Sequence, residues 1–409
     1  MELYSSKPAS TSVVSEVHEA RQRPSSKLLN PANFSEPAGQ SGPRRTTGTR
    51  VFISGVSTAV PEHFIAQTDA AQMASTLGVT QKYRKSLDTM YRLSGVQQRH
   101  CVILDSPAAG PDQRSFYSPS SGPSDHGPST ANRMEKYEAF ATNLALEASR
   151  KALASTGVPA SKITHLVTIS CSGFAAPGVD LALIEQLGLS RDIERAHVGF
   201  MGCHGALNGL RVARGWSAAD PDACVLVCAV ELCSLHLQYT EHAQQLVANA
   251  LFSDGACAFL IQQNGIASSD CQLVSQASHV IANTTEMMSW KIADHGFQMT
   301  LSPKIPEIIM QTLRPWTERW LAKSNYRLED IQNWAVHPGG PRILAATAES
   351  LELPFDALQH SEAILARYGN MSSPTVFFIL ERIRSLAFTG PTVMLGFGPG
   401  LTIEAALLD

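Results

Sequence analysis

The sequence predicts a layered α/β protein built from two related halves. Short apolar strands alternate with amphipathic helices along most of the chain, and the alternation occurs in two successive blocks, 49–267 and 268–409. Such blocks pack in layers because each sheet must bury its apolar face beneath helices. No clean sequence repeat relates the blocks, so their relationship rests on the similar mixture of elements.

Length and composition agree with a large globular core. Of the 409 residues, 44% are hydrophobic and 17% charged, as in folded rather than disordered proteins. The formal net charge is only -4, so we expect no nucleic-acid partner and no polyanionic substrate. A local basic patch for a small phosphorylated ligand is compatible with this charge.

The eight cysteines indicate neither disulfides nor a zinc site. None forms a CxxC pair, and several lie in apolar runs such as ACVLVCAV (223–230), which suits a reducing compartment. The N-terminal segment has no apolar core of a secretory signal, and no apolar stretch is long enough to span a bilayer. We therefore expect a cytoplasmic protein without a membrane span.

The first block follows a predicted flexible tail, 1–48, which is rich in Ser, Pro, Arg and Gln and has no hydrophobic period. A targeting or partner-binding arm is the less favoured interpretation. We predict a strand over Arg50–Val56 and a surface loop over Asp105–Thr130. A helix between them carries the basic residues Lys82, Arg84, Lys85 and Arg92.

A long helix and several strand–helix pairs complete this block. Met134–Ser155 has apolar residues at three- and four-residue spacing, which predicts a helix, and Gly157 ends it. Thr164–Ser170 is an apolar run typical of a strand covered on both faces. The remaining predictions are strands at 195–200, 223–230 and 256–262 and helices at 205–216 and 241–251.

The second block contains the same mixture of elements. Its predicted strands lie near 272–282 and 297–302, at Trp334–His337, and at 391–396 and 402–408. Its predicted helices lie near 305–322, 340–351 and 375–387.

The first candidate for chemistry is Cys203, in HVGFMGCHGALNGLRVA (197–213), where an apolar strand meets a helix. At such a turn, unpaired backbone N–H groups and the positive end of the helix dipole favour the thiolate. The flanking Gly202 and Gly205 allow a sharp turn and the close approach of a thioester. Taken alone, the residue pattern supports a nucleophile and an inert packed cysteine about equally.

Two further polar residues stand at the ends of predicted elements. In NWAVHPGGPRIL (333–344), a strand ends at His337 beside a Pro/Gly turn, where α/β folds bind ligands. The alternative is a histidine that fixes the turn through backbone hydrogen bonds. In YGNMSSPTVFFIL (368–380), Asn370 precedes a helix start, where a lone asparagine would be a turn or cap residue.

Together, Cys203, His337 and Asn370 are sufficient for a decarboxylative condensation. The cysteine would take an acyl group from a thioester, with the imidazolium stabilising its thiolate. The histidine and asparagine N–H groups would both donate to one carbonyl oxygen and stabilise the enolate formed when a malonyl thioester loses carbon dioxide. Decarboxylation supplies the carbanion, so no base is required.

At these segments the chain resembles the type III polyketide synthases, the chalcone and stilbene synthase-like family, from about Arg50 to the end. ALFSDGACAFLI (250–261) is similar to the family's ALFGDGAA segment, and GFGPGLTIEAALL (396–408) is similar to its C-terminal glycine loop. The resemblance implies a thiolase-like five-layered αβαβα fold, a homodimer, acyl-CoA and malonyl-CoA as substrates, and no metal or redox cofactor. It also implies that Phe252 is a gatekeeper between the CoA tunnel and the cavity.

Departures from plant members fall at positions that the resemblance assigns to the cavity. SCSGFAAPG (170–178) stands where plant members read TTSGVDMPG, and ELCSLHL (231–237) also differs. Ala176 replaces a methionine that reaches into the neighbouring subunit's cavity. The implied substrate-binding residues are Phe252, Cys171, Ala176, Cys233, His236, Met299, Ser372, Gly398 and Pro399.

These departures resemble bacterial or fungal members. They favour an aliphatic starter and an alkylpyrone or alkylresorcinol product over a chalcone. The basic cluster formed by Lys82, Arg84, Lys85 and Arg92 is a candidate for binding the CoA phosphates, and a solvated helix face explains it at least as well.

Other activities fit the sequence less well. A β-ketoacyl carrier-protein synthase III-like enzyme also uses Cys, His and Asn, but it stops after one condensation, and the GFGPG and HPGGPRIL segments favour the polyketide synthase. A thiolase would need a second catalytic cysteine in a C-terminal glycine motif, and no cysteine follows Cys271. A non-catalytic scaffold has no support, because all three chemical residues are present.

Overall fold

The part of the chain that the computed structural model describes comprises residues 49–77, 81–105, 115–267, 270–386 and 389–409, without the side chains of 81–85. The predicted tail, 1–48, lies outside the described residues, as does the segment 106–114 of the predicted loop.

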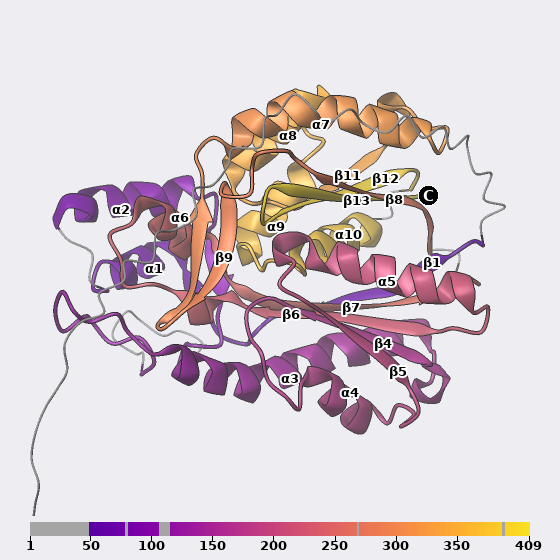
Figure 1. Ribbon diagram of the computed structural model, residues 1–409, viewed down its shortest axis with the longest axis horizontal. Coiled ribbons are helices and arrows are strands. Elements are labelled where there is room, and N and C mark those ends of the chain that lie inside the picture. The colour runs from indigo at the N-terminus through magenta and orange to yellow at the C-terminus, as the bar shows by residue number, and fades with distance from the viewer. Residues whose placement is uncertain (1–48, 78–80, 106–114, 268–269, 387–388) are drawn as a thin grey trace, which may run out of the picture. The chain divides into compact units, whose positions relative to one another are not determined.

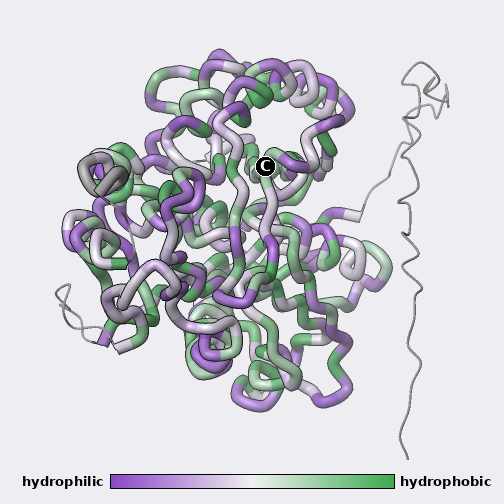
Figure 2. The backbone as a smooth tube through the Cα atoms, turned by 60° about the vertical axis from the view of Figure 1, so that its left-hand side comes forward, coloured by the Kyte–Doolittle hydropathy of each residue, from purple (hydrophilic) through white to green (hydrophobic). Residues whose placement is uncertain are grey.

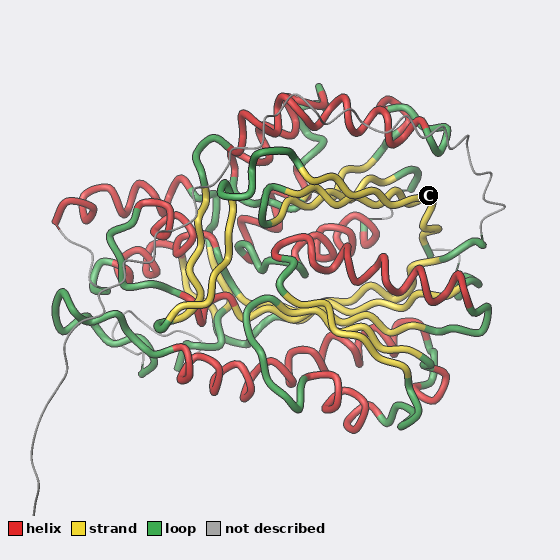
Figure 3. Tube along the Cα trace, in the orientation of Figure 1, coloured by secondary structure: helices red, strands yellow, loops and turns green. Residues whose placement is uncertain are grey.

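The described fold has five layers in which helices and strands alternate (Figures 1 and 3). Helices α7 and α8 cover one sheet layer, α5 and α10 lie between the two sheet layers, and α3 and α4 cover the other. The predicted thiolase-like αβαβα arrangement is confirmed. The bounds are α3 Thr130–Thr156, α4 Val179–Leu187, α5 Gly205–Ala219, α7 Ile305–Ala322, α8 Pro341–Leu351 and α10 Thr375–Ser385.

The strands follow the order β11-β12-β13-β8-β1-β7-β6-β4-β5. The two layers meet only between β1 and β8, through the pairs Phe52–Gln272 and Ile53–Cys271. The first layer contains β1 Phe52–Ala59, β4 His165–Ser170, β5 Glu194–Gly199, β6 Val225–Leu232 and β7 Asp254–Gln262. The second contains β8 Cys271–Val280, β11 Asn333–Val336, β12 Thr392–Gly398 and β13 Thr402–Leu408.

The two layers share one pattern of strand pairing. In the first, β4 and β6 are parallel, and β6–β7 and β7–β1 are antiparallel. In the second, β11 and β12 are parallel, and β12–β13 and β13–β8 are antiparallel. The halves are therefore related in topology, although no sequence repeat reveals it. The boundary predicted at 267/268 stays a prediction.

Strand β6 shows why its sequence is continuously apolar. All eight of its residues are buried. Leu226 and Val230 pack in the core beneath α3, whereas Val225 and Val227 pack in the core between the sheet layers. Because successive side chains alternate between faces, a strand that is covered on both faces needs apolar residues throughout.

The outer helices, such as α3 and α7, are amphipathic by contrast. Along the outer helices the backbone alternates between hydrophilic and hydrophobic residues (Figure 2). Helix α3 begins after Ser129, whose side chain accepts a hydrogen bond from the Asn132 N–H, and it ends at Gly157 with φ of 68°. Serine at the start of a helix supplies an acceptor for a free N–H group, and glycine at its end adopts the left-handed conformation without strain.

Several elements were not predicted because they are short or half-exposed. They are α1 Gln67–Ala74, α9 Gln359–Tyr368, β2 Phe64–Ala66, β3 Gln98–His100 and β9 Met288–Ala293, in addition to α4. Strand β9 forms a hairpin with β10 Gly296–Leu301. The prediction of a surface loop over 105–130 is wrong at Tyr117, which is 1% exposed and donates a hydrogen bond to the Ser234 carbonyl. Aromatic burial anchors that segment.

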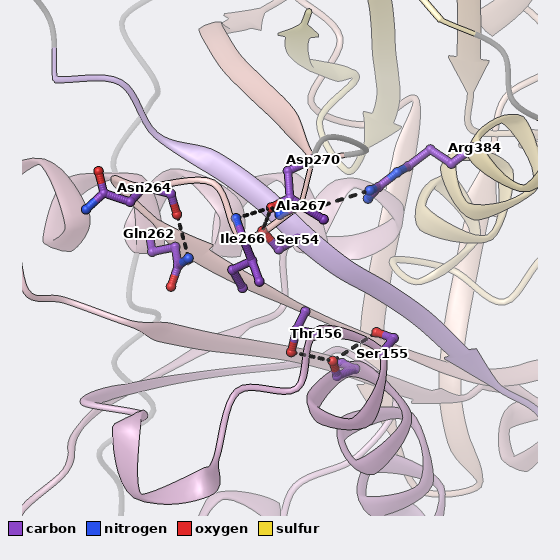
Figure 4. Close-up of polar contacts among 10 residues, drawn as sticks. Ser54, Ser155, Thr156, Gln262, Asn264, Ile266, Ala267, Asp270 and Arg384 are labelled. Carbon is purple, nitrogen blue, oxygen red and sulfur yellow. Dashed lines mark hydrogen bonds and ion pairs between the residues drawn. The ribbon is translucent and has the colours of Figure 1, made fainter.

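The connection between the two halves is held by the buried Asp270 carboxylate (Figure 4). It accepts hydrogen bonds from Ser54 Oγ at 2.7 Å and from the N–H groups of Ile266 and Ala267 at 2.5 and 2.9 Å. Arg384 Nη2 lies 3.8 Å from Asp270 Oδ1 and forms an ion pair with it. The carboxylate thus ties β1, the connecting segment and α10 together where β1 meets β8.

Replacing Asp270 by asparagine is expected to lower the free energy of unfolding by about 1–3 kcal/mol, because the Ser54 hydroxyl and the Ile266 and Ala267 N–H groups lose a charged acceptor. Urea unfolding measures the change. Asp192→Asn, at an exposed position, is the control and should change stability by less than about 0.5 kcal/mol. Equal stability of the Asp270 variant and the wild-type protein would contradict this role.

Candidate active site

Cys203 lies at the turn between β5 and α5. Residues Gly202–His204 form a 3₁₀ turn, and α5 starts at the next residue. Gly202 has φ of 68°, and a Cβ there would lie 2.4 Å from Pro399 Cδ. Glycine is therefore required for both the turn and the close approach of the C-terminal loop.

Asn370 is brought to Cys203 by a main-chain bridge with Phe252. The Asn370 N–H donates to the Leu251 carbonyl, and its carbonyl accepts from the Ser253 N–H, both at 2.9 Å. Asn370 Oδ1 accepts from the Ser372 N–H at 2.8 Å. Its side chain and that of Ser372 also lie close enough to the Cys203 sulfur to act on the pKa of the thiol.

His337 follows β11 and is 1% exposed. The main-chain N–H of His337 donates to the Leu395 carbonyl at 2.8 Å. Its imidazole lies near that of His204, the residue after Cys203. Neither ring nitrogen has a hydrogen-bond partner among the residues that the structure describes. A buried imidazole with both nitrogens free is unusual, because buried polar groups are normally paired, and it is suited to binding a ligand.

Burial dominates the electrostatics of this site. It raises the pKa of Cys203 to about 12, although the Ser372 and Asn370 side chains act in the opposite direction. Burial, and to a lesser extent His204, lowers the pKa of His337 to about 3. Burial therefore opposes the stabilisation of the thiolate that is expected from the helix end. A thiolate here requires a countercharge formed in the same buried site, which a proton passed to an imidazole would supply.

Seven of the predicted site residues line one space, the Cys203 cavity. It is lined by Cys171, Ser172, Gly202, Cys203, Glu231, Cys233, Phe252, Met288, Trp290, Met299, Ser372 and Pro399. Met299 and Trp290 are cross-strand partners in the β9–β10 hairpin. Sequence reasoning missed Trp290 and Met288 because β9 was not predicted.

An adjoining space, the inner cavity, shares Cys233, Phe252 and Trp290 with the Cys203 cavity and has a mainly apolar lining. Its lining is Ile65, Met73, Arg99, Cys101, Ile103, Leu104, Cys233, Ser234, His236, Leu237, Gln245, Ala248, Asn249, Phe252 and Trp290. The predicted residue His236 therefore lines the inner cavity rather than the Cys203 cavity.

Trp290 lines both cavities and packs against the rings of Phe252 and His236. Trp290 Nε1 donates to the Cys171 carbonyl at 2.8 Å, and its ring lies 6.2 Å from that of Phe252 and 5.3 Å from that of His236. His236 stacks on Phe297 at 4.1 Å. The Phe297 N–H donates to His236 Nδ1, so Nε2 carries the proton and donates to the Ser172 carbonyl. Burial lowers the pKa of His236 to about 3.

Glu231 is a second residue that sequence reasoning missed. It is fully buried and accepts hydrogen bonds from the N–H groups of Cys171 and Ser172 and from the hydroxyls of Ser172 and Ser373. Burial raises its pKa to about 7. An acidic residue inside the apolar run of β6 was the available signal. Its contacts fix the end of β4 beside Cys203.

Of the predicted catalytic and substrate-binding residues, four line neither cavity: His337, Asn370, Ala176 and Gly398. Ala176 is exposed and lines a separate hollow with Phe174 and Pro177. Gly398 is buried against His204, and a Cβ on Gly398 would lie 2.3 Å from the His204 ring. The role predicted for Ala176 involves a neighbouring subunit and stays a prediction.

The helix predicted for the basic cluster is α2, Gln81–Leu93. Arg92 is exposed on it. The side chains of Lys82, Arg84 and Lys85 lie outside the described residues, so their role toward CoA stays a prediction. Within the described part of the chain, no helix is long and apolar enough to cross a membrane.

Comparison with known proteins agrees with this fold and site. The sequence matches "Chalcone and stilbene synthases, N-terminal domain" over 40–265 and the corresponding C-terminal domain over 272–409. Alpha-pyrone synthesis polyketide synthase-like Pks18 of Mycobacterium tuberculosis is 31% identical over 370 residues, which cover 88% of this chain and 91% of the relative. A 1,3,6,8-tetrahydroxynaphthalene synthase of Streptomyces peucetius subsp. caesius is 32% identical, with 90% and 95% covered.

A solved structure supports the same assignment. PKS-I from the brown alga Ectocarpus siliculosus superposes with a TM-score of 0.81 at 28% identity, covering 88% of this chain and 98% of that one. The fold is therefore that of a thiolase-like acyl-transferring enzyme. The chain belongs to the chalcone and stilbene synthase family, and it is a type III polyketide synthase.

Proposed function

We propose that this polyketide synthase condenses an aliphatic acyl-CoA starter with malonyl-CoA and releases an alkylpyrone or alkylresorcinol. The observation that carries the proposal is the mainly apolar inner cavity, which adjoins the Cys203 cavity across Phe252 and Trp290. The similarity to a relative named for α-pyrone synthesis supports the product class. CoA thioesters are the only small molecules required, and the enzyme acts in the cytoplasm.

In the loading step, Cys203 Sγ attacks the carbonyl carbon of the starter thioester. The thiol proton passes through His337 to the departing CoA sulfur, and the acyl group remains on Cys203. The raised pKa of the thiol and the lowered pKa of the imidazole make the neutral pair the resting state. An ion pair then exists only while the thioester is attacked.

In the extension step, malonyl-CoA loses carbon dioxide and becomes an enolate. The Asn370 amide and the His337 imidazole N–H donate to the enolate oxygen. The enolate carbon attacks the acyl thioester, a carbon–carbon bond forms, and Cys203 Sγ leaves. The product is a β-ketoacyl-CoA that can be loaded again.

The cavities must widen to accept a starter chain. Their free volumes are about 20 Å³ for the Cys203 cavity and 30 Å³ for the inner cavity, close to the space of a single water each. Met288 and Met299 line the Cys203 cavity, and unbranched methionine side chains change rotamer readily. We propose that an acyl chain displaces them and the Trp290 ring as it enters.

A homodimer is part of this proposal. Strands β4 and β5 end side by side at the pair Ser170–Gly199. Beyond these ends, Phe174, Phe200 and Met201 are 66%, 54% and 44% exposed. Apolar side chains gathered beside the Ala176 loop fit a subunit interface, where Ala176 would face the partner's cavity.

A panel of acyl-CoA starters with malonyl-CoA, read by mass spectrometry, tests the proposed substrate. We expect kcat/KM to rise about fourfold for each added methylene until the cavity is full, since each buried methylene contributes about 0.8 kcal/mol. Ala248→Leu, in the inner-cavity lining, should shift the preference toward shorter starters and spare Cys203 acylation by a short acyl-CoA.

Ala250→Leu is the matched control for that variant. Ala250 is as buried as Ala248 and lies in the same helix, α6 Ala243–Leu251, but it does not line the inner cavity. It should lower stability without changing chain-length preference. A wild-type enzyme that used 4-coumaroyl-CoA far better than any fatty acyl-CoA would refute the aliphatic starter. A single condensation that requires a carrier protein would favour the β-ketoacyl synthase activity instead.

A further inference from the structure

Arg99 is a buried cation at the junction of two segments that carry the proposed chemistry. It is 4% exposed, lies in β3, and has no acidic hydrogen-bond partner among the described residues. Instead, Nη1 donates to the main-chain carbonyls of Asn249 at 2.6 Å and Phe252 at 3.0 Å. These carbonyls belong to the C-terminal end of α6, where a positive charge is favoured by the helix dipole.

The same side chain packs on the segment that carries Asn370. Gly369 has φ of 74°, and a Cβ there would lie 3.1 Å from Arg99 Cγ and 3.0 Å from the Leu251 carbonyl oxygen. Glycine is therefore what allows this segment to lie directly against both Arg99 and the end of α6. Arg99 thus contacts Phe252 directly and lies beside Gly369, the residue before Asn370.

The bridge links the position of Phe252 to that of Asn370. It has two main-chain hydrogen bonds, each 2.9 Å long, between Asn370 and the Leu251–Ser253 segment. Ser253 Oγ adds a hydrogen bond to the Tyr368 carbonyl. The Asn370 side chain then reaches the Cys203 sulfur. A shift at the end of α6 would be transmitted to the amide that faces the nucleophile.

The surroundings of Arg99 keep its charge in place. Its guanidinium carbon lies 5.6 Å from the centre of the buried Tyr91 ring. The buried Asp254 carboxylate provides the nearby negative charge, and it is itself held by the Val102 and Ser234 N–H groups and the Ser234 hydroxyl. The Tyr91 ring and the Asp254 carboxylate thus stabilise the charge of the guanidinium.

We propose that Arg99 is a positioning residue that holds the Phe252 and Asn370 segments in one geometry and so aligns the Asn370 amide with Cys203. The proposal rests on the proposed function, in which Asn370 stabilises the malonyl-derived enolate. It assigns to Arg99 an effect on decarboxylation and extension but not on loading of the starter.

Arg99→Met tests this assignment, with loading and decarboxylation measured separately. Acylation of Cys203 is followed by mass spectrometry of the intact protein, and decarboxylation by release of labelled carbon dioxide from malonyl-CoA. We expect the rate of decarboxylation to fall about 10²-fold, which is the loss that a misplacement of a catalytic group by about 1 Å causes. The rate of loading should be nearly unchanged. Arg99→Lys should recover part of the loss, because it keeps the positive charge at the end of α6 but lacks the rigid, planar guanidinium that fixes Nη1 between the two carbonyls.

Arg133→Met is the matched control for burial of a cation. Arg133 is 0% exposed and donates to the carbonyls of Pro128, Leu235 and Leu237, away from the bridge. The Arg133→Met variant should have a lowered melting temperature, as Arg99→Met does. Its ratio of decarboxylation rate to loading rate should equal that of the wild-type protein. The same ratio change in both variants would overturn the proposal.

Two other results separate the possible failures. Arg99→Met with normal decarboxylation and a raised KM for acyl-CoA starters would overturn the positioning role and make Arg99 a starter-binding residue of the inner cavity. If the wild-type protein itself forms no acyl adduct on Cys203, the proposed function fails independently of Arg99.

Discussion

Cys203→Ala is expected to abolish acyl-enzyme formation and polyketide synthesis. The variant removes the only atom that can carry the acyl group at the strand–helix turn, and no remaining contact replaces a covalent intermediate. Incubation with an acyl-CoA followed by mass spectrometry of the protein measures the result. The wild-type enzyme should gain one acyl group, located on the peptide that contains Cys203, and the variant should gain none.

The neighbouring thiols make this test demanding. Cys171 and Cys233 line the same cavity, and burial holds the pKa of each well above the usual value of a thiol. Cys203 differs from them in lying at the turn that begins α5, where the Ser372 and Asn370 side chains act against the rise of its pKa. Cys224→Ala, at a buried position at the start of β6, should retain acylation. An adduct found on Cys171 or Cys233 would overturn the assignment of the nucleophile.

Asn370→Ala is expected to separate loading from decarboxylation. The Phe252–Asn370 bridge uses only main-chain groups, so alanine preserves it, and only the amide is lost. Removing one such donor costs ~10²–10³ in rate. The variant should therefore take the starter onto Cys203 and release carbon dioxide from malonyl-CoA ~10²–10³ times more slowly.

Stability must be measured in parallel, because the Ser372 N–H loses its acceptor in this variant. Asn333→Ala is a suitable control, since Asn333 is also buried and hydrogen-bonded but lies at the start of β11. It should lower the melting temperature and keep decarboxylation. Near-normal decarboxylation by the Asn370 variant would show that its amide does not stabilise the enolate.

Local sequence patterns were sufficient for the regular elements. The helix predicted near 305–322 coincides with α7, and the strand at 402–408 coincides with β13. Strand β1 was displaced, since Phe52–Ala59 continues beyond the predicted Val56 because β7 pairs with it as far as Ala59. Hydrophobic periodicity reports which face of an element is buried, but strand ends depend on the partner strand.

The sequence by itself determined the fold class, the family and the cysteine at the strand–helix turn, because each is written in short contiguous segments such as 197–213 and 396–408. Only the tertiary structure decided which side chains surround Cys203. Trp290 reaches Cys171 across 119 residues, and Glu231 reaches Ser373 across 142. Local periodicity carries no record of such contacts, because they arise only when distant elements pack together. The same packing places Ala176 outside both cavities and places Arg99 between the segments of Phe252 and Asn370, and neither position could be read from the sequence.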